Sequence, residues 1–477
     1  MKTVYDVAVV GCGAGGYQAA ITAARLGAQV ALIERDTLGG SCLNRACVPK
    51  KALAHMANLL AETQALAGLG LSGRLTADLK AAIAFKDKLV AGLIRGLPVR
   101  LQSLSVDLRM GTAHLVAPHE IHLSGPREHA TISARSIILA TGSAPRALPP
   151  CPVDHIRIVN GDSFIESLSR AADTVLCVGG GALGIEAAFI LRQFGSHVTI
   201  IESGPRLLDR PVISDRAAGF LERRLVALGV TVRKGVTVQE TKAYQDGVWV
   251  QFSDGSEGQF DRVLVAVGRV PQSDDLGLAA LGVRFDSAGF VVTDEYCATN
   301  VPGLYAIGDM CGGVMTAAGA MHDGRIAGEN AAGGEKRQRR PHQVPLVIDS
   351  AVSVAAVGLS EDMAEAAGFT PGVLSVPFAA SVKAQAYNDA GGFIEIVHDE
   401  ETGQMLGGCV VGAGADELVH LLAAACLSRR GLWTFTDLNY GHPSSGEIMG
   451  AALDSYLGVL SQSVDTLFRP GIYAHPD

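Results

Sequence analysis

The sequence predicts an α/β fold in which one strand–turn–helix–strand unit occurs twice and is followed by a smaller α+β domain. Two observations indicate this class. The chain contains two glycine-rich turns, each preceded by a short apolar run and followed by a second apolar run that ends in glutamate. Its 477 residues also leave room for about three domains.

The two units match each other in spacing. In the first, residues 5–10 are predicted to form a buried strand before the turn, and residues 29–33 form the next strand before Glu34. In the second, residues 174–178 form the strand, and residues 197–201 precede Glu202. The interval from the first glycine to the glutamate is 23 positions in both units, from 11 to 34 and from 179 to 202. Such agreement favours a true repeat over two unrelated loops.

Each turn predicts a dinucleotide-binding, Rossmann-like domain. The first glycine allows a tight turn, the second lets the backbone approach a pyrophosphate, and the third lets the helix pack on the strand. The glutamate would accept hydrogen bonds from ribose hydroxyls and repel a 2′-phosphate, so the second unit is expected to prefer NAD to NADP. The residues with these expected roles are Gly11, Gly13, Gly16 and Glu34 in the first unit and Gly179, Gly181, Gly184 and Glu202 in the second.

Two cysteines directly after the first unit indicate thiol redox chemistry. Cys42 and Cys47 lie five positions apart, a separation that in a regular helix exceeds the roughly 7 Å over which a disulfide usually closes. A bridge therefore requires irregular backbone, and Pro49 is expected to supply it by disfavouring helical geometry at Val48. A bridge in so tight a loop stabilises little, which favours a cycled bond over a structural one.

Two other interpretations of the cysteine pair are weaker. The cysteines could be reduced core residues or half of a metal site. A zinc site would need a second closely spaced pair, and the other seven cysteines are scattered singly along the chain. No metal is therefore expected.

Composition narrows the function classes further. A net charge of −9 argues against a nucleic acid or an anionic membrane surface as partner. No uncharged apolar run reaches the length that spans a bilayer. Nine cysteines without the spacing of a disulfide framework favour a reducing, cytoplasmic location.

Proline-rich and charged segments predict the domain boundaries. One boundary is expected at residues 147–152, where three prolines interrupt the pattern, and another at the basic run of residues 335–341. On an acidic chain that run is better interpreted as a solvated linker than as a nucleic-acid patch. The elements predicted beyond it are strands at residues 344–348, 352–357, 393–397 and 406–411 and a helix at 416–428.

Taken together, these motifs resemble those of the flavoprotein disulfide reductases, and within them the dihydrolipoamide dehydrogenases. The resemblance rests on the cysteine run, on both glycine turns and on the segments at residues 140–143, 267–271 and 304–309. It extends from Tyr5 to about Leu460. A match of this extent implies the fold and cofactors of that family.

The resemblance implies FAD in the first unit and NAD in the second. It implies an FAD-binding domain at 1–148 and 272–343, the latter its central part, an NAD-binding domain at 149–271, and an interface domain with a C-terminal tail at 344–477 that joins two copies in a homodimer. Asp309 matches the aspartate that holds the ribityl chain of FAD. The other positions that carry over as cofactor-binding are Ser41, Thr141, Gly142 and Gly268.

The resemblance also implies catalytic residues outside the cysteine pair. Lys51 matches a lysine placed against the flavin and ion-paired with a glutamate that corresponds to Glu186. His442 and Glu447 match the family's base, which acts in the other subunit's site across the dimer interface. Pro443 suits the first position of a helix, so His442 is expected at its N-terminal end, where Glu447 would offset the unfavourable dipole.

The implied reaction transfers electrons between protein-bound dihydrolipoyl groups and NAD through the Cys42–Cys47 disulfide and FAD. Two alternatives stay open: a reductase of another disulfide, similar to glutathione reductase, and a non-catalytic flavin-binding subunit. The sequence departs from the family at several positions, which puts the ordinary lipoamide-regenerating role in question. These departures are Arg45, Ala46, Lys50, Ala318, Gly319, Val352, Ser353, Tyr440 and a tail at residues 461–477.

Overall fold

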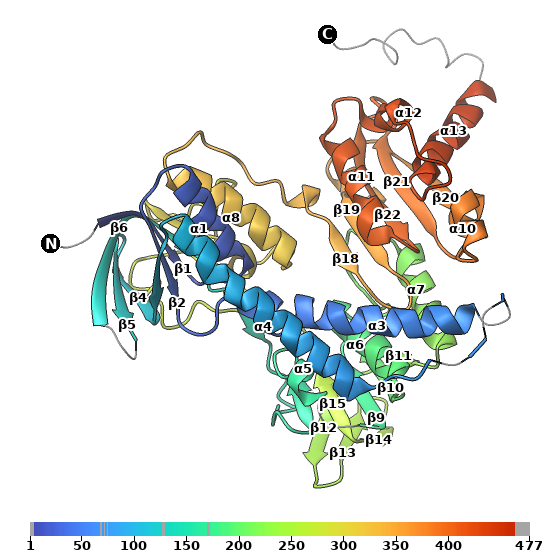
Figure 1. Cartoon of the computed structure of the whole chain (residues 1–477), viewed down its shortest axis with the longest axis horizontal. Coiled ribbons are helices and arrows are strands. Elements are labelled where there is room, and N and C mark those ends of the chain that lie inside the picture. Colours follow the sequence, from blue (N-terminus) through green and yellow to red (C-terminus); the bar gives the residue numbers. More distant parts are fainter. Residues whose placement is uncertain are drawn as a thin grey trace.

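The computed structural model describes residues 4–66, 69–70, 72–73, 75–125, 129–168 and 172–462, and of 455–462 only the helical backbone. It confirms the predicted fold class. Figure 1 shows two α/β units and a third domain, with the first unit on the left, the second below centre and the third at the upper right. All three parts meet near the middle of the molecule, where the site described below lies.

The first unit is a mainly parallel sheet covered by helices. Its strands are β1 (Val4–Val10), β2 (Val30–Glu34), β3 (Asp107–Met110), β4 (Thr112–Ala117), β5 (Glu120–Ser124), β6 (His129–Leu139) and β17 (Leu304–Ala306). The order is β3-β2-β1-β6-β5-β4, and β17 pairs in parallel with β6. A segment from beyond the second unit therefore returns to complete the first sheet. The predicted first strands agree with β1 and β2 to within one residue at each end.

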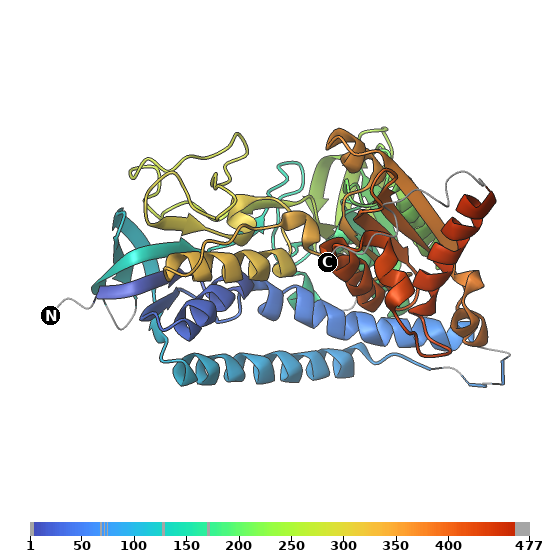
Figure 2. The same cartoon turned by 90° about the horizontal axis from the view of Figure 1, so that it is seen from above.

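Helices pack on this sheet and extend from it. They are α1 (Ala14–Arg25), α2 (Gly40–Asn44), α3 (Cys47–Ala65), α4 (Leu79–Ser103), the 3₁₀ turn η1 (Gly308–Cys311) and α8 (Ala317–Ala331). Figure 2 shows the long helices α3 and α4 along one side of the molecule. α3 reaches from the first unit to α6 of the second, which carries the second glycine turn (α6, Ala182–Gln193).

The second unit repeats the parallel arrangement. Its elements are β8 (Ile158–Asn160), α5 (Phe164–Ser167), β9 (Thr174–Val178), α6, β10 (His197–Glu202), α7 (Asp215–Ala227), β11 (Thr231–Lys234) and β15 (Arg262–Val265), with an antiparallel sheet of β12 (Val238–Ala243), β13 (Val248–Phe252) and β14 (Glu257–Phe260). The strand order is β11-β10-β9-β15-β8, all parallel. The chain enters and leaves this unit through the antiparallel pair β7 (Ser143–Pro145) and β16 (Arg269–Pro271).

The third domain is an antiparallel sheet with helices. Its elements are η2 (Pro341–Gln343), β18 (Leu346–Ile348), β19 (Val354–Gly358), α9 (Glu361–Ala366), β20 (Pro371–Pro377), η3 (Phe378–Ala380), α10 (Val382–Ala386), β21 (Phe393–Asp399), β22 (Met405–Val411), α11 (Ala415–Leu427), η4 (Gly431–Trp433), α12 (Thr434–Asp437) and α13 (Glu447–Gln462). Four of the five strands were predicted. The strand β20 was not predicted, because a proline stands at each end of it. Prolines are typical of edge strands, and β20 forms the edge of the sheet beside β21.

Two local predictions about proline are wrong. Val48 and Pro49 lie inside the first turn of α3, so the irregular backbone falls earlier, at Arg45 and Ala46. A proline in a first turn loses no helical hydrogen bond, because the first amides of a helix have no partner in the helix. The helix predicted to begin at Pro443 begins instead at Glu447; serines and a glycine occupy 444–446, and these residue types favour turns.

Two further predictions concern the ends of the domains. The basic run at 335–341 is a mostly exposed connection, and Arg337 within it pairs with Glu329 of α8 at 2.9 Å. The predicted tail begins at the last two residues of α13, and the remainder, 463–477, lies outside the described residues. Among the helices that the structure describes, none combines the length and apolar character needed to cross a membrane.

Close packing of α8 on α1 depends on small residues. A Cβ added to Gly328 would lie 2.7 Å from the carbonyl oxygen of Ala19 and 3.0 Å from the Cβ of Thr22. We expect Gly328→Ala to lower the free energy of unfolding by about 1–3 kcal/mol, because neither neighbour can move without shifting α1. Urea denaturation followed by circular dichroism measures this change.

Gly96→Ala is the matched control for that substitution. Gly96 lies on the exposed side of α4, and a Cβ there would meet no atom within 4 Å. Alanine at this helical position should raise stability by up to about 1 kcal/mol. Equal effects of the two substitutions would contradict the packing argument.

Candidate active site

A cleft of about 730 Å³ lies where the three parts of the chain meet. The first glycine turn, the cysteine run and the residues after β6 form much of its wall, and the start of α6 and the strand β18 complete it. The residues with predicted site roles that line the cleft are Gly11, Gly13, Glu34, Ser41, Cys42, Cys47, Lys51, Thr141, Gly142, Glu186 and Asp309. The fold therefore brings most of the predicted first-unit residues to one place.

The glycine turns have the geometry predicted for them. Gly11 and Gly179 have φ values of +100° and +109°, which only glycine adopts readily. A Cβ at either would lie 2.5 Å from a carbonyl oxygen of the neighbouring strand end, at Ala140 or Ala266. Tight turns of this kind place the next residues at the start of a helix.

The second and third glycines of each turn differ in what they face. A Cβ on Gly16 or Gly184 would collide with the carbonyl oxygen of the first glycine of its own turn, so both serve helix packing. A Cβ added to Gly13 would meet no atom closer than 3.9 Å, and one added to Gly181 would meet none within 4 Å. A phosphate group can therefore approach the backbone at these two positions, and the residues present fit a dinucleotide in each unit.

The two predicted ribose-binding glutamates are held in the same way. The amide of Cys12 donates to Oε2 of Glu34 at 2.7 Å, and the amide of Gly180 donates to Oε2 of Glu202 at 2.7 Å. Each carboxylate is therefore fixed beside the glycine turn of its own unit. The two units therefore match each other in individual hydrogen bonds as well as in sequence spacing.

The loops after β6 and β17 are joined on the cleft wall. Asp309, in η1, accepts a hydrogen bond through Oδ2 from the hydroxyl of Ser143 at 2.6 Å. Thr141 donates to the carbonyl oxygen of Gln272 at 2.6 Å, and the amide of Gln272 donates to the carbonyl of Gly142 at 2.9 Å.

Two further predicted cofactor-binding positions, Ser41 and Gly268, make backbone hydrogen bonds, and only Ser41 lines the cleft. Ser41 lines the cleft within α2, and its carbonyl accepts the amides of Arg45 and Ala46, both at 2.8 Å. Gly268 is not among the cleft-lining residues: it precedes β16 with φ +100°, and its carbonyl accepts the amide of Arg146 at 3.0 Å. The positive φ of Gly268 therefore shapes the turn by which the chain leaves the second unit through β16.

Cys42 and Cys47 lie together despite their spacing. Cys42 belongs to α2, Cys47 is the first residue of α3, and the irregular residues between them bring the thiols into hydrogen-bonding contact. The hydrogen bond from Cys42 lowers the pKa of Cys47 to about 7, with help from the charge of Lys50 and against burial and Glu186. The same hydrogen bond, together with burial, raises the pKa of Cys42.

The ion pair expected between Lys51 and Glu186 is not formed; this prediction is wrong. Lys50 pairs with Glu186, and Lys51 instead pairs with Asp349 at 3.3 Å. Adjacent helical residues point about 100° apart, so only one of the two lysines can face Glu186. Asp349 follows β18, and its amide donates to Oε1 of Glu186 at 3.0 Å, which joins the third domain to the pair.

His442 and Glu447 make the predicted contact. Nδ1 of His442 lies 2.7 Å from Oε1 of Glu447, and the amide of Ser444 donates to Oε2 of Glu447 at 2.6 Å. These hydrogen bonds, that of Ser444 first, lower the pKa of Glu447. The His442 side chain is 69 % exposed and is not among the residues lining the cleft of its own chain.

Sequence reasoning missed the roles of Asp349 and Lys50. Lys50 was noted only as a departure from the family pattern, and no motif marks Asp349 because its part depends on the docking of the third domain. Within the described parts of the chain, no group of three or more His, Cys, Asp or Glu residues is arranged to hold a metal ion.

Comparison with known families assigns the whole fold. The family described as pyridine nucleotide-disulphide oxidoreductase matches residues 5–324, and the dimerisation domain of the same family matches residues 344–453. The chain therefore carries a dimerisation domain at the position of its antiparallel sheet.

Individual relatives agree with this assignment. A dihydrolipoyl dehydrogenase from Thermus scotoductus is 37% identical over 95% of this chain and 97% of its own, and one from Bacillus subtilis is 32% identical over 95% and 96%. Among solved structures, LpdA from Mycobacterium tuberculosis superposes with a TM-score of 0.88 at 26% identity, covering 95% of this chain and 99% of that one. The flavoprotein disulfide reductase RclA from Escherichia coli gives 0.80 at 25% identity, covering 93% and 98%.

The charge arrangement predicts different effects of the two lysines on Cys47. In the reduced protein, alkylation of Cys47 by iodoacetamide should be half-maximal near pH 7 and fall as the thiolate is protonated at lower pH. Lys50→Met removes the cation that favours the thiolate, so the pKa rises and the alkylation rate at pH 6 falls about tenfold. Mass spectrometry of the peptide containing Cys47 measures the rate.

Lys51→Met is the matched control, since Lys51 points toward Asp349 and the cation that lowers the pKa of Cys47 is Lys50. It should change the rate by less than about twofold. If Lys51→Met lowered the alkylation rate more than Lys50→Met, the result would favour the expected arrangement, in which Lys51 pairs with Glu186.

Proposed function

The chain belongs to the pyridine nucleotide-disulphide oxidoreductase family, and from this premise we propose that it carries electrons between protein-bound dihydrolipoyl groups and NAD through Cys42 and Cys47. It is a flavin-dependent disulfide oxidoreductase of the dihydrolipoyl dehydrogenase type, with FAD and NAD as cofactors. The observation that supports the site assignment is the contact of the two thiols on the cleft wall at the start of α3.

We assign FAD to the first unit and NAD to the second. Gly13, Glu34, Thr141 and Asp309 would hold the first dinucleotide, and Gly181 and Glu202 the second. The open space at both second glycines supports this assignment. When bound, the flavin supplies two-electron transfer between the sulfur couple and the nicotinamide.

The chain's own residues would carry out the thiol chemistry. His442 of the partner subunit, held by its Glu447, takes the proton from one dihydrolipoyl thiol, and the resulting thiolate attacks the sulfur of Cys42 in the disulfide. Cys47 leaves as a thiolate, which its low pKa favours. The second dihydrolipoyl thiol then closes the substrate disulfide and releases the sulfur of Cys42.

The step is balanced as a two-electron exchange. One dihydrolipoyl dithiol is oxidised to a disulfide while the Cys42–Cys47 disulfide is reduced to a thiol and a thiolate. Reoxidation of the thiol and the thiolate supplies two electrons and one proton, the equivalent of the hydride that NAD receives. The other proton of the dihydrolipoyl dithiol, taken up by His442 of the partner subunit, is released to solution. The same steps run in reverse when NADH is in excess.

We place the working enzyme in a reducing cytoplasm as a homodimer. The seven cysteines outside the Cys42–Cys47 couple are free thiols, which fits such a compartment. The dimerisation domain carries the His442–Glu447 pair near its C-terminal end, where a second copy can receive it. A lipoyl-carrying protein is the proposed substrate partner.

Substitution at Cys42 tests the assigned chemistry. Cys42→Ser should abolish NAD reduction by dihydrolipoamide, a loss of at least about a thousandfold, because no mixed disulfide can form at the outer sulfur. Flavin content, read from its visible absorbance, should be unchanged. Cys151→Ser, at a buried cysteine outside the cleft, is the control and should leave turnover near that of the unaltered enzyme.

The substrate is tested with the unaltered enzyme. Free dihydrolipoamide, lipoyl proteins and reduced glutathione are compared as electron donors to NAD. Faster turnover of glutathione than of every lipoyl donor would overturn the substrate assignment, and retained turnover by Cys42→Ser would overturn the role of the cysteine pair.

Complementation between subunits tests the shared site. The homodimers of Cys42→Ser and of His442→Gln should each lack activity. After reversible dissociation and mixing in equal amounts, half of the dimers are mixed and each carries one intact site, so about a quarter of full activity should return. No recovery, with mixed dimers present by mass spectrometry, would mean that His442 does not act across the interface.

A further inference from the structure

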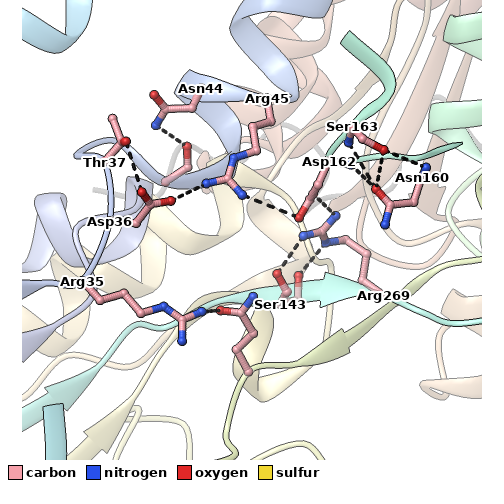
Figure 3. A network of polar contacts seen from close by, with 12 residues as sticks. Arg35, Asp36, Thr37, Asn44, Arg45, Ser143, Asn160, Asp162, Ser163 and Arg269 are labelled. Atoms are coloured by element: carbon pink, nitrogen blue, oxygen red, sulfur yellow. Dashed lines mark hydrogen bonds and ion pairs between the residues drawn. The ribbon is translucent and has the colours of Figure 1, made fainter. Parts of the chain in front are cut away.

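Arg45 stands between the two cysteines and contacts parts of both dinucleotide-binding units. It caps α2, three residues after Cys42 and two before Cys47. Its Nη2 lies 2.6 Å from Oδ2 of Asp36, and its Nη1 lies 3.9 Å from Oδ2 of Asp162. Figure 3 shows the guanidinium between these two carboxylates.

The carboxylates belong to different units. Asp36 follows β2 of the first sheet, and Asp162 lies between β8 and α5 of the second unit. A planar guanidinium presents its donors in a fixed fork and so can bridge two acids, which a lysine cannot do with the same geometry. The loop that joins the cysteines is therefore connected to both units by one side chain.

The bridge continues into the cleft wall. Oδ1 of Asp162 accepts from Arg269 at 3.2 Å, and Arg269 donates to the hydroxyl and the carbonyl of Ser143, both at 2.7 Å (Figure 3). The hydroxyl of Ser143 in turn donates to Asp309. The network thus runs from Asp36 through Arg45, Asp162, Arg269 and Ser143 to Asp309, and removing Arg45 would separate Asp36 from the rest.

The network gives these contacts more weight than isolated surface pairs have. The Arg45 side chain is 38 % exposed, Asp36 is 60 % exposed and Asp162 is 24 % exposed, so the network is more buried toward the second unit. Single exposed pairs contribute little, whereas members of a network in partly buried surroundings reinforce one another. The backbone of Arg45 is also fixed, because its amide donates to the carbonyl of Ser41 at 2.8 Å.

We propose that Arg45 is a positioning residue for the Cys42–Cys47 couple, which ties the loop between the sulfurs to both dinucleotide-binding units and keeps the two thiols close enough to form their disulfide. The inference rests on the proposed redox role of the two cysteines. Holding two thiols together raises the effective concentration of each toward the other, which favours the disulfide over the dithiol. Arg45 therefore shifts the thiol–disulfide equilibrium without touching either sulfur.

The test measures that equilibrium directly. The purified full-length protein with its flavin is equilibrated in buffers of reduced and oxidised glutathione, and the Cys42–Cys47 disulfide is quantified by alkylation and mass spectrometry. Two glutathione thiols become one glutathione disulfide as the protein disulfide is reduced, so the equilibrium constant follows from the fraction oxidised. Arg45→Val should shift this constant about three- to tenfold toward the dithiol.

Two other variants separate position from charge. Arg45→Lys keeps the charge but loses the fork, so its shift should fall between those of the unaltered protein and Arg45→Val. Arg430→Val is the matched control, because Arg430 forms a 2.6 Å pair with Asp437 at similar exposure (40 %) in the third domain. It should leave the constant unchanged.

The contact with the second unit is tested by a double-mutant cycle. The effects of Arg45→Val and Asp162→Asn should be less than additive, and raised salt should move the unaltered protein, but not Arg45→Val, toward the dithiol. Additive effects, or equal constants for Arg45→Val and Arg430→Val, would overturn the inference and leave the proposed function standing. Absence of a Cys42–Cys47 disulfide in the unaltered protein in oxidising buffer would instead overturn the proposed function.

Discussion

The contact between two thiols at the first residue of α3 is the interaction on which the site depends. A regular helix would hold Cys42 and Cys47 too far apart, so the chain has to break between them. One carbonyl, that of Ser41, stabilises the break by accepting at 2.8 Å the amides of Arg45 and Ala46, the two residues between α2 and α3. The break also brings the thiol of Cys42 within hydrogen-bonding reach of Cys47, and that hydrogen bond lowers the pKa of Cys47. Geometry and acidity at this sulfur thus have a single structural cause.

The repeated glycine turn is the second constraint, and it explains why the cysteines lie where they do. Each turn fixes one glutamate through one backbone amide at 2.7 Å, so both units present a helix start and a carboxylate in the same relation. The first turn shares the cleft wall with the cysteine run. The second turn stands at the start of α6, and α6 contributes Glu186 to the same cleft. Residues next to both glycine turns therefore meet in one cleft beside the two cysteines.

The elements that depend on residues close together in the sequence were predicted correctly. The strands of both repeats were placed to within about one residue, because buried strands and glycine turns leave a strong pattern. The partner of Lys51 could not be predicted, since it depends on how the strand ending before Asp349 docks on α3. The start of α13 was misplaced because a proline that suits a helix also suits a turn, and the serines and glycine after it favour the turn. The wrong predictions therefore concern contacts between segments far apart in the sequence, or a residue type that is common in both helices and turns.

Charged side chains connect the segment that carries Cys42 and Cys47 to all three parts of the chain. Lys50 pairs with Glu186 of the second unit, and the same glutamate accepts the amide of Asp349 from the third domain. On the other side of Cys47, between the two cysteines, Arg45 pairs with acids of the first and second units. The loop between the sulfurs is thus held from both sides by parts of the molecule that are far apart in sequence.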